Sequence, residues 1–212
     1  SDKEDAPGAL EHTRSTIAEV FDIEIPYAVV IDFRGFEKIV DLIGGVDINV
    51  PEAIDDPLYP KDGTYDYERF FLPAGNQHLD GKTALKYVRS RKTSSDFDRG
   101  KRQQQMLIAL RDRALEKEIL TSPGTLKQIY RTVADHIGAT MDIREMMSFA
   151  SLAAEFDTKK IYHWNIHDDP TRTGGFLYTP VRELYGGAFV LIPAPDKWDD
   201  VKRYVSLIAT GG

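Results

Sequence analysis

Apolar residues recur at helical spacing in several segments of the chain. The side chains that share one side of a predicted helix over residues 9–21 are Leu10, Thr13, Ile17, Val20 and Phe21. A second, short helix is predicted over 36–43 and ends at the pair of glycines that follows it. Asp80 has a side chain suited to cap a third helix, which runs through Tyr87.

The longest predicted helix covers about 95–120, with Ser95 or Asp96 as its N-cap. Its apolar stripe consists of Met106, Leu107, Leu110 and Ala114. Three further helices are predicted, with starts at Ser122-Pro123, Asp142-x-x-Glu145 and Trp198. The second of these ends at Phe156 and the third at Ile208.

Short apolar or alternating runs between the helices predict strands. The continuous apolar run Tyr27–Ile31 favours a buried strand, and Val46–Val50 alternates as a half-buried strand does. The loop-rich region 51–76 contains a turn signal at Asp62-Gly63, which favours a hairpin. Further short strands are predicted over 87–91, 161–166 and 188–192.

Helical and extended segments alternate along the chain, which is typical of the α/β class. We therefore predict a mixed β-sheet flanked by helices. No evident linker interrupts the sequence, so residues 1–212 are predicted to form one domain. Within that domain, residues 121–212 hold a helical insert followed by a C-terminal β/α part. The apolar residues expected to pack its core include Phe33, Phe36, Ile39 and Ile43.

Composition excludes several kinds of site. The chain has no cysteine, so it has no disulfide, no thiolate metal ligand and no cysteine nucleophile. No run of 18 apolar residues is present, so the sequence predicts no membrane-spanning segment. The net charge is −7, from 27 basic and 34 acidic residues, which argues against a general nucleic-acid binder.

Positive charge is nevertheless concentrated between Lys82 and Arg113. This segment contains ten Lys or Arg residues against three Asp, so it carries +7 and the rest of the chain −14. A basic island in an acidic chain indicates a local anion site. For Lys101, Arg111 and Arg113, which lie in an amphipathic helix, a solvated helix face is the simpler interpretation.

Four side chains of this island have the spacing to point at one small volume. Arg89 and Arg91 are two apart and would share a face of an extended strand. Arg99 and Gln103 are four apart and would share a face of a helix. Arginine stays charged and presents forked donors that match phosphate or pyrophosphate oxygens. We predict that the four side-chain ends lie within roughly 10 Å of each other.

Five sequence blocks follow one another between about residues 10 and 115. They are Asp32-Phe-x-Gly-Phe36, Val40-Asp-Leu-Ile-Gly-Gly-Val46, Leu79-Asp-Gly-Lys-x-Ala-Leu-Lys-Tyr87, Arg89-x-Arg91, and Asp96-Phe-Asp-Arg99 with Arg102-Gln103. In order and spacing this series resembles the LytR-CpsA-Psr family of cell-wall glycopolymer ligases. The resemblance implies an α-β-α sandwich.

The resemblance also implies a phosphotransferase that moves an anionic glycopolymer, such as teichoic acid or capsule, from a polyprenyl-pyrophosphate carrier to peptidoglycan. Pyrophosphate hydrolysis would be a side reaction. The implied partners are the glycolipid, peptidoglycan and the membrane, through an anchor that this sequence lacks, and no nucleic acid. The implied place of action is the extracytoplasmic face of the bacterial membrane. The alternative is a non-catalytic module that binds or regulates polyprenyl-phosphate glycolipids at the cell envelope.

By the same resemblance, the residues that bind pyrophosphate are Arg89, Arg91, Arg99, Arg102 and Gln103. Arg91 and Arg99 would be catalytic, while Asp96 and Asp98 would hold arginines in place. The family implies Mg²⁺ or Mn²⁺ as a cofactor. Its carboxylate ligands are expected upstream of Ser1, so no metal ligand is assigned within this sequence and the isolated chain is expected to be inactive.

Overall fold

The computed structural model describes residues 6–61, 63–90, 96–119, 122–155, 166, 168 and 174–210. The chain separates into two compact units. One is formed by residues 29–158, and the other by residues 1–28 together with 159–212. The prediction of one domain over residues 1–212 stays a prediction.

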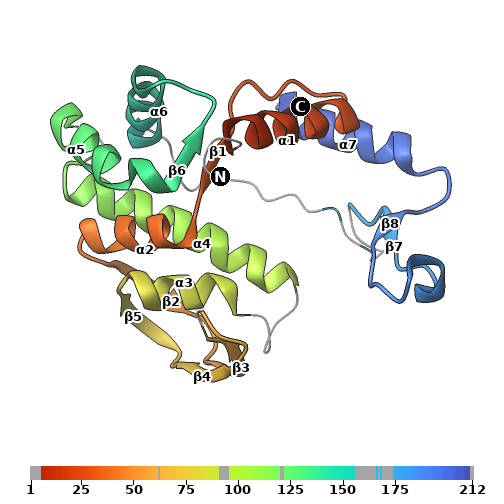
Figure 1. The fold of residues 1–212 in the computed structure, drawn as a ribbon, viewed down its shortest axis with the longest axis horizontal. Helices are drawn as coiled ribbons and strands as arrows, with labels where there is room; N and C mark the ends of the chain where they lie inside the picture. The colour runs from red at the N-terminus through yellow and green to blue at the C-terminus, as the bar shows by residue number, and fades with distance from the viewer. Residues whose placement is uncertain are drawn as a thin grey trace. The chain divides into compact units, whose positions relative to one another are not determined.

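The larger unit, residues 29–158, alternates helices with short strands (Figure 1). Its elements are β1 (Val29–Ile31), α2 (Phe33–Leu42), β2 (Val46–Val50), β3 (Ile54–Pro60), β4 (Tyr67–Leu72), β5 (Gly75–Leu79), α3 (Gly81–Arg89), α4 (Asp96–Glu116), α5 (Pro123–Val133), η1 (Ala134–His136), β6 (Ile137–Ala139) and α6 (Ile143–Glu155). This order of helices and strands fits the α/β class that the sequence pattern predicts.

The described strands of this unit pair antiparallel. β1 pairs with β6, β2 with β5, and β3 with β4, and the last pair is the hairpin predicted near Gly63. The described strands therefore form separate antiparallel pairs in place of the mixed sheet that the alternation of elements predicts. Antiparallel neighbours need only a short connection, such as the one between β3 and β4, whereas a parallel pair needs a long crossover.

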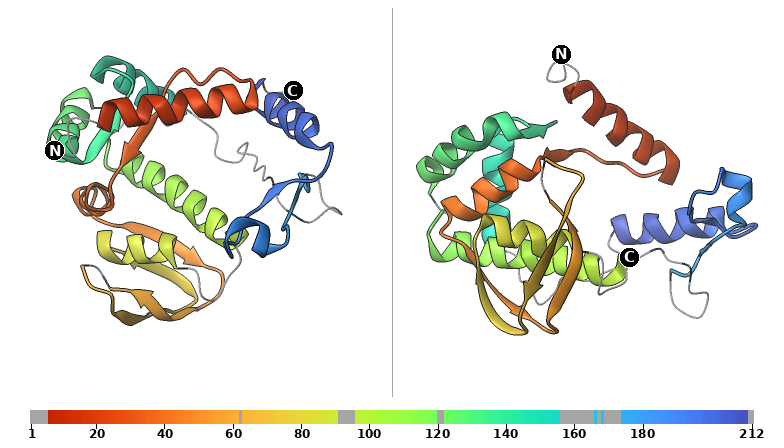
Figure 2. Two further views of the ribbon diagram at one scale, coloured as in Figure 1. Left: turned by 45° about the vertical axis from the view of Figure 1, so that its right-hand side comes forward. Right: turned by 60° about the horizontal axis from the view of Figure 1, so that its bottom comes forward.

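The core of this unit lies between the β2–β5 pair and the helices that cover it. Val46, Ile48 and Val50 of β2 are each at most 2% exposed, while the intervening residues face outward. This confirms the alternation predicted for the strand. Helix α4 packs on β2, and helix α3 packs on α2, α4 and β5 (Figure 2).

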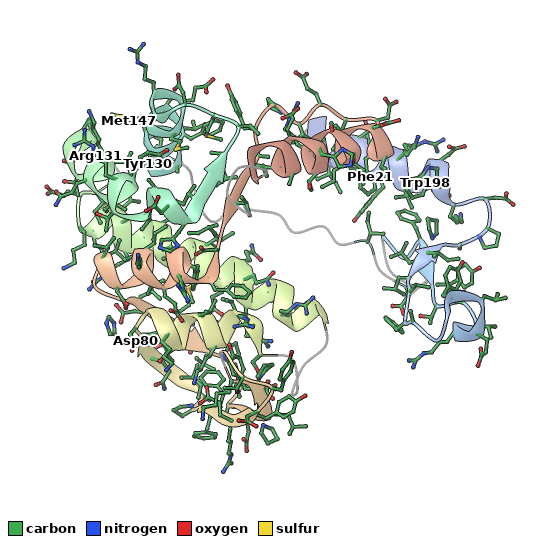
Figure 3. All side chains as sticks on the ribbon, in the orientation of Figure 1. Phe21, Asp80, Tyr130, Arg131, Met147 and Trp198 are labelled. Carbon is green, nitrogen blue, oxygen red and sulfur yellow. The ribbon has the colours of Figure 1, made fainter. Side chains whose placement is uncertain are left out.

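Helices α2 and α3 approach closely because the residue at their contact is glycine. A Cβ atom at Gly81 would lie 2.2 Å from the backbone oxygen of Glu37. The N–H of Gly81 donates to Asp41 Oδ1 at 2.7 Å, which joins the first residue of α3 to α2. Asp80 (labelled in Figure 3) caps the same end of α3 by accepting the N–H of Thr83 at 2.8 Å, as its sequence position predicts.

Helix α3 extends to Arg89, so the predicted strand over 87–91 is wrong for its described part. Ala84, Leu85 and Val88 lie at helical spacing, and each is at most 9% exposed. Burial of this helical face stabilises the helix beyond the point at which the sequence suggests extended structure. Residue 91 lies outside the described residues.

Two arginines of α4 bind backbone carbonyl groups at the ends of other helices. Arg111 donates to Ala153 O at 2.8 Å and Ala154 O at 3.2 Å, in the last turn of α6. Arg113 donates to Gly44 O at 3.2 Å, just beyond α2. Carbonyl groups at a helix end have no partner within their own helix. Both arginines are half-buried, so their interpretation as a solvated helix face is wrong.

Other predicted helix ends are confirmed where a side chain caps the backbone. Ser122 Oγ accepts the N–H of Thr125 at 3.4 Å at the start of α5. Asp142 Oδ1 accepts the N–H of Glu145 at 2.9 Å, and Glu145 Oε2 accepts the N–H of Asp142 at 2.8 Å. This is the reciprocal capping box that the spacing of the two acidic residues predicts.

Some apolar residues are exposed where the sequence pattern predicts burial. In β1, Val29, Val30 and Ile31 are 57%, 48% and 36% exposed. In α4, Leu107 is 66% exposed, whereas Met106 at 1% belongs to the buried stripe. Adjacent helical residues point about 100° apart, so only one of this pair can face the core.

The second unit contains α1 (Ala6–Phe21), β7 (Leu177–Tyr178), η3 (Arg182–Tyr185), β8 (Ile192–Pro193) and α7 (Trp198–Thr210). Helix α1 packs against α7, with the ring centroids of Phe21 and Trp198 6.1 Å apart (Figure 3). The strand predicted over 188–192 is wrong for most of its length, because only the residues opposite β7 are paired. Residues 161–165, predicted as a strand, lie outside the described residues.

Long apolar helices are absent from the described parts of both units. No helix formed by these residues combines the length and the apolar composition needed to cross a membrane.

Replacing Arg111 with alanine should lower the free energy of unfolding by about 1–3 kcal/mol, because partly buried carbonyls of α6 lose a charged donor. Arg131→Ala is the matched control. Arg131 is exposed on α5 (Figure 3), and its loss should change stability by less than about 0.5 kcal/mol. Urea denaturation at neutral pH measures both, and equal losses would contradict the role given to Arg111.

Gly81→Ala should lower the free energy of unfolding by about 3 kcal/mol, because the new Cβ would overlap the backbone of Glu37 and push α2 from α3. Gly124→Ala on α5 is the control, since a Cβ there meets no atom within 4 Å. That change should stabilise the protein by about 0.4–1 kcal/mol. The midpoint of thermal or urea unfolding should therefore fall for Gly81→Ala and rise for Gly124→Ala.

Candidate functional site

The basic island centres on the place where α3 ends and α4 begins. Arg89 is the last residue of α3, Arg99 lies half-buried in the first turn of α4, and Gln103 is exposed one turn later. Arg91 and the side chains of Asp96 and Asp98 lie outside what the structure describes. The convergence of the predicted site residues therefore stays a prediction, while the positions of the two helix ends are established.

Arg102 joins these two helix ends. It is 8% exposed, and its guanidinium donates from Nε to Tyr87 O at 3.0 Å and from a terminal nitrogen to Ser90 O. Both carbonyls belong to the C-terminal end of α3, where the helix dipole favours a cation. These bonds give Arg102 a positioning role, and its direct contact with pyrophosphate stays a prediction. Arg99 precedes it by nearly one turn, so the two Cα atoms are about 4.5 Å apart along the α4 axis.

The residue after α3 is fixed from a second direction. Ser90 is 1% exposed, and its hydroxyl donates to Asp56 Oδ2 at 2.8 Å. Asp56, itself 2% exposed, also accepts the N–H of Leu58 at 3.2 Å through Oδ1. The end of α3 is therefore bound both to α4 and to β3. A buried carboxylate is tolerated there because hydrogen-bond donors surround it.

A third link connects α3 with α4 and β2. The hydroxyl of Tyr87 donates to Gln105 Oε1 at 2.8 Å, and Gln105 Nε2 donates to Asn49 O at 2.7 Å. Burial raises the pKa of Tyr87, and the positive charge of Arg102 acts in the opposite direction. The tyrosine is therefore a neutral donor at physiological pH and a structural part of the junction.

Lys86, another cation of the island, is directed toward β4. Its ammonium group forms an ion pair with Glu68 and lies 5.6 Å from the ring centroid of Tyr59 and 5.9 Å from that of Phe70. The hydrogen bond from Lys86 lowers the pKa of Glu68. Since its charge is already matched by a carboxylate, Lys86 contributes less to an anion site than the sequence count suggests.

The guanidinium of Arg89 lies over aromatic rings. Its central carbon is 4.1 Å from the ring centroid of Phe33, in the first turn of α2, and 5.7 Å from that of Tyr59. Phe33 is 56% exposed, so the prediction that it packs into the core is wrong. Sequence reasoning missed this pair because Phe33 and Arg89 meet only through the packing of α2 against α3.

Asp32, the first residue of the sequence blocks, holds two segments together. Its Oδ1 accepts the N–H of Gly35 at 2.7 Å, so α2 begins at Phe33, three residues earlier than predicted. Its Oδ2 lies 2.8 Å from His136 Nδ1, and the ammonium of Lys38 donates to His136 Nε2 at 2.8 Å. The N–H of Gly35, followed by the His136 ring, lowers the pKa of Asp32.

The described residues do not fit a divalent metal. They contain no group of three or more His, Asp or Glu side chains placed to hold an ion. Mg²⁺ and Mn²⁺ prefer several oxygen ligands at short distance, which a single Asp–His contact does not supply.

Asp32→Asn should lower the free energy of unfolding at pH 7. The difference in this free energy between the variant and the unaltered chain should shrink as the pH falls below about 4. Because the pKa of Asp32 is lower in the folded state than in the unfolded state, the ionised carboxylate stabilises the protein at any pH above the pKa of the unfolded state. This stabilisation is lost as the pH falls through the pKa of the folded state. Asp32→Ala also removes the helix cap, so it should remain less stable at pH 3 by about 1 kcal/mol. Urea unfolding at pH 7, 5 and 3 tests this, and a constant difference for Asp32→Asn would contradict it.

Comparison with known sequences identifies relatives of this chain. A model of the LytR_cpsA_psr family matches residues 6–185. Polyisoprenyl-teichoic acid–peptidoglycan teichoic acid transferase TagV of Bacillus subtilis is 29% identical over 180 residues, which are 84% of this chain and 43% of TagV. Probable cell wall biosynthesis protein LcpB of Corynebacterium glutamicum is 36% identical over 126 residues, 59% of this chain and 27% of LcpB. The chain thus spans about half or less of the length of these curated relatives.

Solved structures show the same fold. The crystal structure of Bacillus subtilis TagV has a TM-score of 0.66 at 23% identity and covers 94% of this chain and 70% of its own. A structure of TagT bound to LI-WTA has a TM-score of 0.64 at 23% identity, over 98% of this chain and 70% of that one. These likenesses confirm the α/β fold class.

Proposed function

Because the chain belongs to the LytR_cpsA_psr family, we propose that it acts in transfer of an anionic glycopolymer to peptidoglycan. The proposed donor is a polyprenyl-pyrophosphate-linked polymer, and the proposed place of action is the extracytoplasmic face of the membrane. Relatives named as teichoic acid transferases support polymer transfer to peptidoglycan as the reaction class. Pyrophosphate hydrolysis would follow as a side reaction when water replaces the acceptor sugar.

The junction of α3 and α4 is the observation that carries this proposal. A buried arginine binds the end of α3 to the second turn of α4, and each helix end carries a further arginine of the island, Arg89 and Arg99. Two cations carried at adjoining helix ends suit a ligand with two neighbouring phosphates. The N-terminal end of α4 adds a partial positive charge to the same place.

The proposed reaction is a displacement at phosphorus. An acceptor sugar hydroxyl attacks the phosphorus next to the glycopolymer, the bond from that phosphorus to the bridging oxygen breaks, and polyprenyl phosphate leaves. The proton of the hydroxyl passes to the leaving phosphate or to water. Arg89 and Arg99 would neutralise the oxygens of the two phosphates as negative charge shifts to the leaving group. Fixed donors accelerate such a step because they need no rearrangement as the charge develops.

Arg99→Ala should reduce glycopolymer transfer by about 10²- to 10³-fold, the usual effect of losing one fixed donor to a developing charge. The assay uses the full-length protein, a short polyprenyl-pyrophosphate glycolipid and a peptidoglycan acceptor, with circular dichroism to check the fold. Transfer by Arg99→Ala at the unaltered rate would remove this residue from the proposed site.

The control for that experiment is Lys127→Ala. Lys127 is exposed on α5 and should leave the transfer rate within about twofold, because exposed charges away from a site have small effects. Arg111, further along α4, is unsuitable as a neutral control because it binds the end of α6. A matching loss in Lys127→Ala would indicate a general effect of charge and would argue against a local site.

The 212-residue chain should bind Mg²⁺ only weakly, since the described residues offer no cluster of three candidate ligands. Isothermal titration calorimetry with Mg²⁺, and with Mn²⁺ as a second probe, measures this. Micromolar affinity for either ion would show that residues of this chain do form a metal site.

A further inference from the structure

The stacked pair Phe33–Arg89 links the first sequence block to the basic island. The distance of 4.1 Å from the guanidinium carbon to the ring centroid of Phe33 is shorter than any other such distance among the described cation–aromatic pairs. It corresponds to van der Waals contact between the planar group and the ring, well inside the reach of a cation–π interaction. Phe33 is 56% exposed, so its ring is not explained by burial in the core.

The two residues are brought together by rigid backbone. Phe33 is fixed at the start of α2 by the cap from Asp32, and Arg89 is fixed at the end of α3 by the bonds that Arg102 makes to the neighbouring carbonyls. Between them, α2 and α3 are in backbone contact at Gly81. The stack therefore joins two side chains whose backbones have little freedom to move relative to one another.

Stacking restricts an arginine without using its hydrogen-bond donors. The N–H groups of a guanidinium lie in its plane, so a ring against its flat face leaves them directed sideways. A long side chain that is already held loses less conformational entropy when it binds an anion. The exposed ring of Phe33 would therefore preset the direction in which Arg89 presents its donors.

We propose that Phe33 is a positioning residue that holds the Arg89 guanidinium by stacking, so that its in-plane donors meet a pyrophosphate group. This inference rests on the proposed function, because it assigns Arg89 to the same anion site. The proposal assigns Phe33 no contact of its own with the phosphate. Its effect on binding is exerted through Arg89 alone.

Phe71 provides a matched control on β4. It is also 56% exposed, and the guanidinium carbon of Arg69 lies 5.9 Å from its ring centroid. The charge of Arg69 is bound by Asp55 at 2.7 and 2.6 Å, so this second pair belongs to a surface ion pair. Removing either exposed ring takes away the same chemical group, but only Phe33 lies against an arginine of the proposed site.

The experiment measures binding of inorganic pyrophosphate to the 212-residue chain by calorimetry. Phe33→Leu should weaken binding by roughly two- to sixfold, the effect expected for loss of one exposed cation–π contact. Phe33→Trp, which restores a flat ring, should bind within about twofold of the unaltered chain. Phe71→Leu should also bind within about twofold. In an Arg89→Ala background, Phe33→Leu should add no further loss, because the residue through which it acts is gone.

The outcomes separate this inference from the proposed function. Unchanged binding by Phe33→Leu, or an equal loss in the presence and absence of Arg89, would overturn the positioning role alone. Unchanged binding by Arg89→Ala, or no binding by the unaltered chain, would overturn the anion site and this inference with it. The NMR shift of the Arg89 side-chain Nε–H gives a readout independent of ligand. It should move when Phe33→Leu removes the ring and stay in place in Phe71→Leu.

Discussion

One repeated interaction holds residues 29–158 together: an arginine of α4 binds carbonyl groups at the C-terminal end of another helix. Arg102 binds the end of α3, Arg111 the end of α6, and Arg113 the residue just beyond α2. The last turn of a helix has carbonyls without intrahelical partners, and its dipole makes that end negative. A guanidinium suits such a helix end because its five donors can bind the unpartnered carbonyls and its permanent positive charge offsets the negative end of the dipole. Helix α4 thereby fixes three other helix ends relative to its own axis.

Several cations of the basic island have a structural role. Arg102, Arg111 and Arg113 are directed at backbone carbonyls, and Lys86 is paired with Glu68. Their charge is used within the fold, so the local charge of +7 overstates the charge available for an anion. Arg102 nevertheless serves the proposed site, because it holds the end of α3 against α4. The proposed pyrophosphate contacts then depend on side chains carried by those two ends.

The residues of the family's sequence blocks include many that hold backbone segments in contact. Asp32 caps α2 and pairs with His136. A side chain at position 35 has no room, because a Cβ atom built on Gly35 would lie 2.6 Å from the Cβ atom of His136. Gly81 plays a similar role between α2 and α3. A motif can therefore place arginines without all of its members touching the ligand. The sequence predicts that the cations gather in one region, whereas the stack between Phe33 and Arg89 depends on which helices pack together.

Local physical chemistry allowed the sequence by itself to determine the α/β class, the alternation of β2 and most helix starts. The caps at Asp80 and Ser122 work through bonds to residues three positions away, so sequence spacing is enough to locate them. Only the tertiary structure decided whether α3 continued to Arg89, whether Arg111 faced water or α6, and whether Phe33 entered the core. Each of those outcomes depends on a partner tens of residues distant along the chain, and periodicity contains no information about that partner.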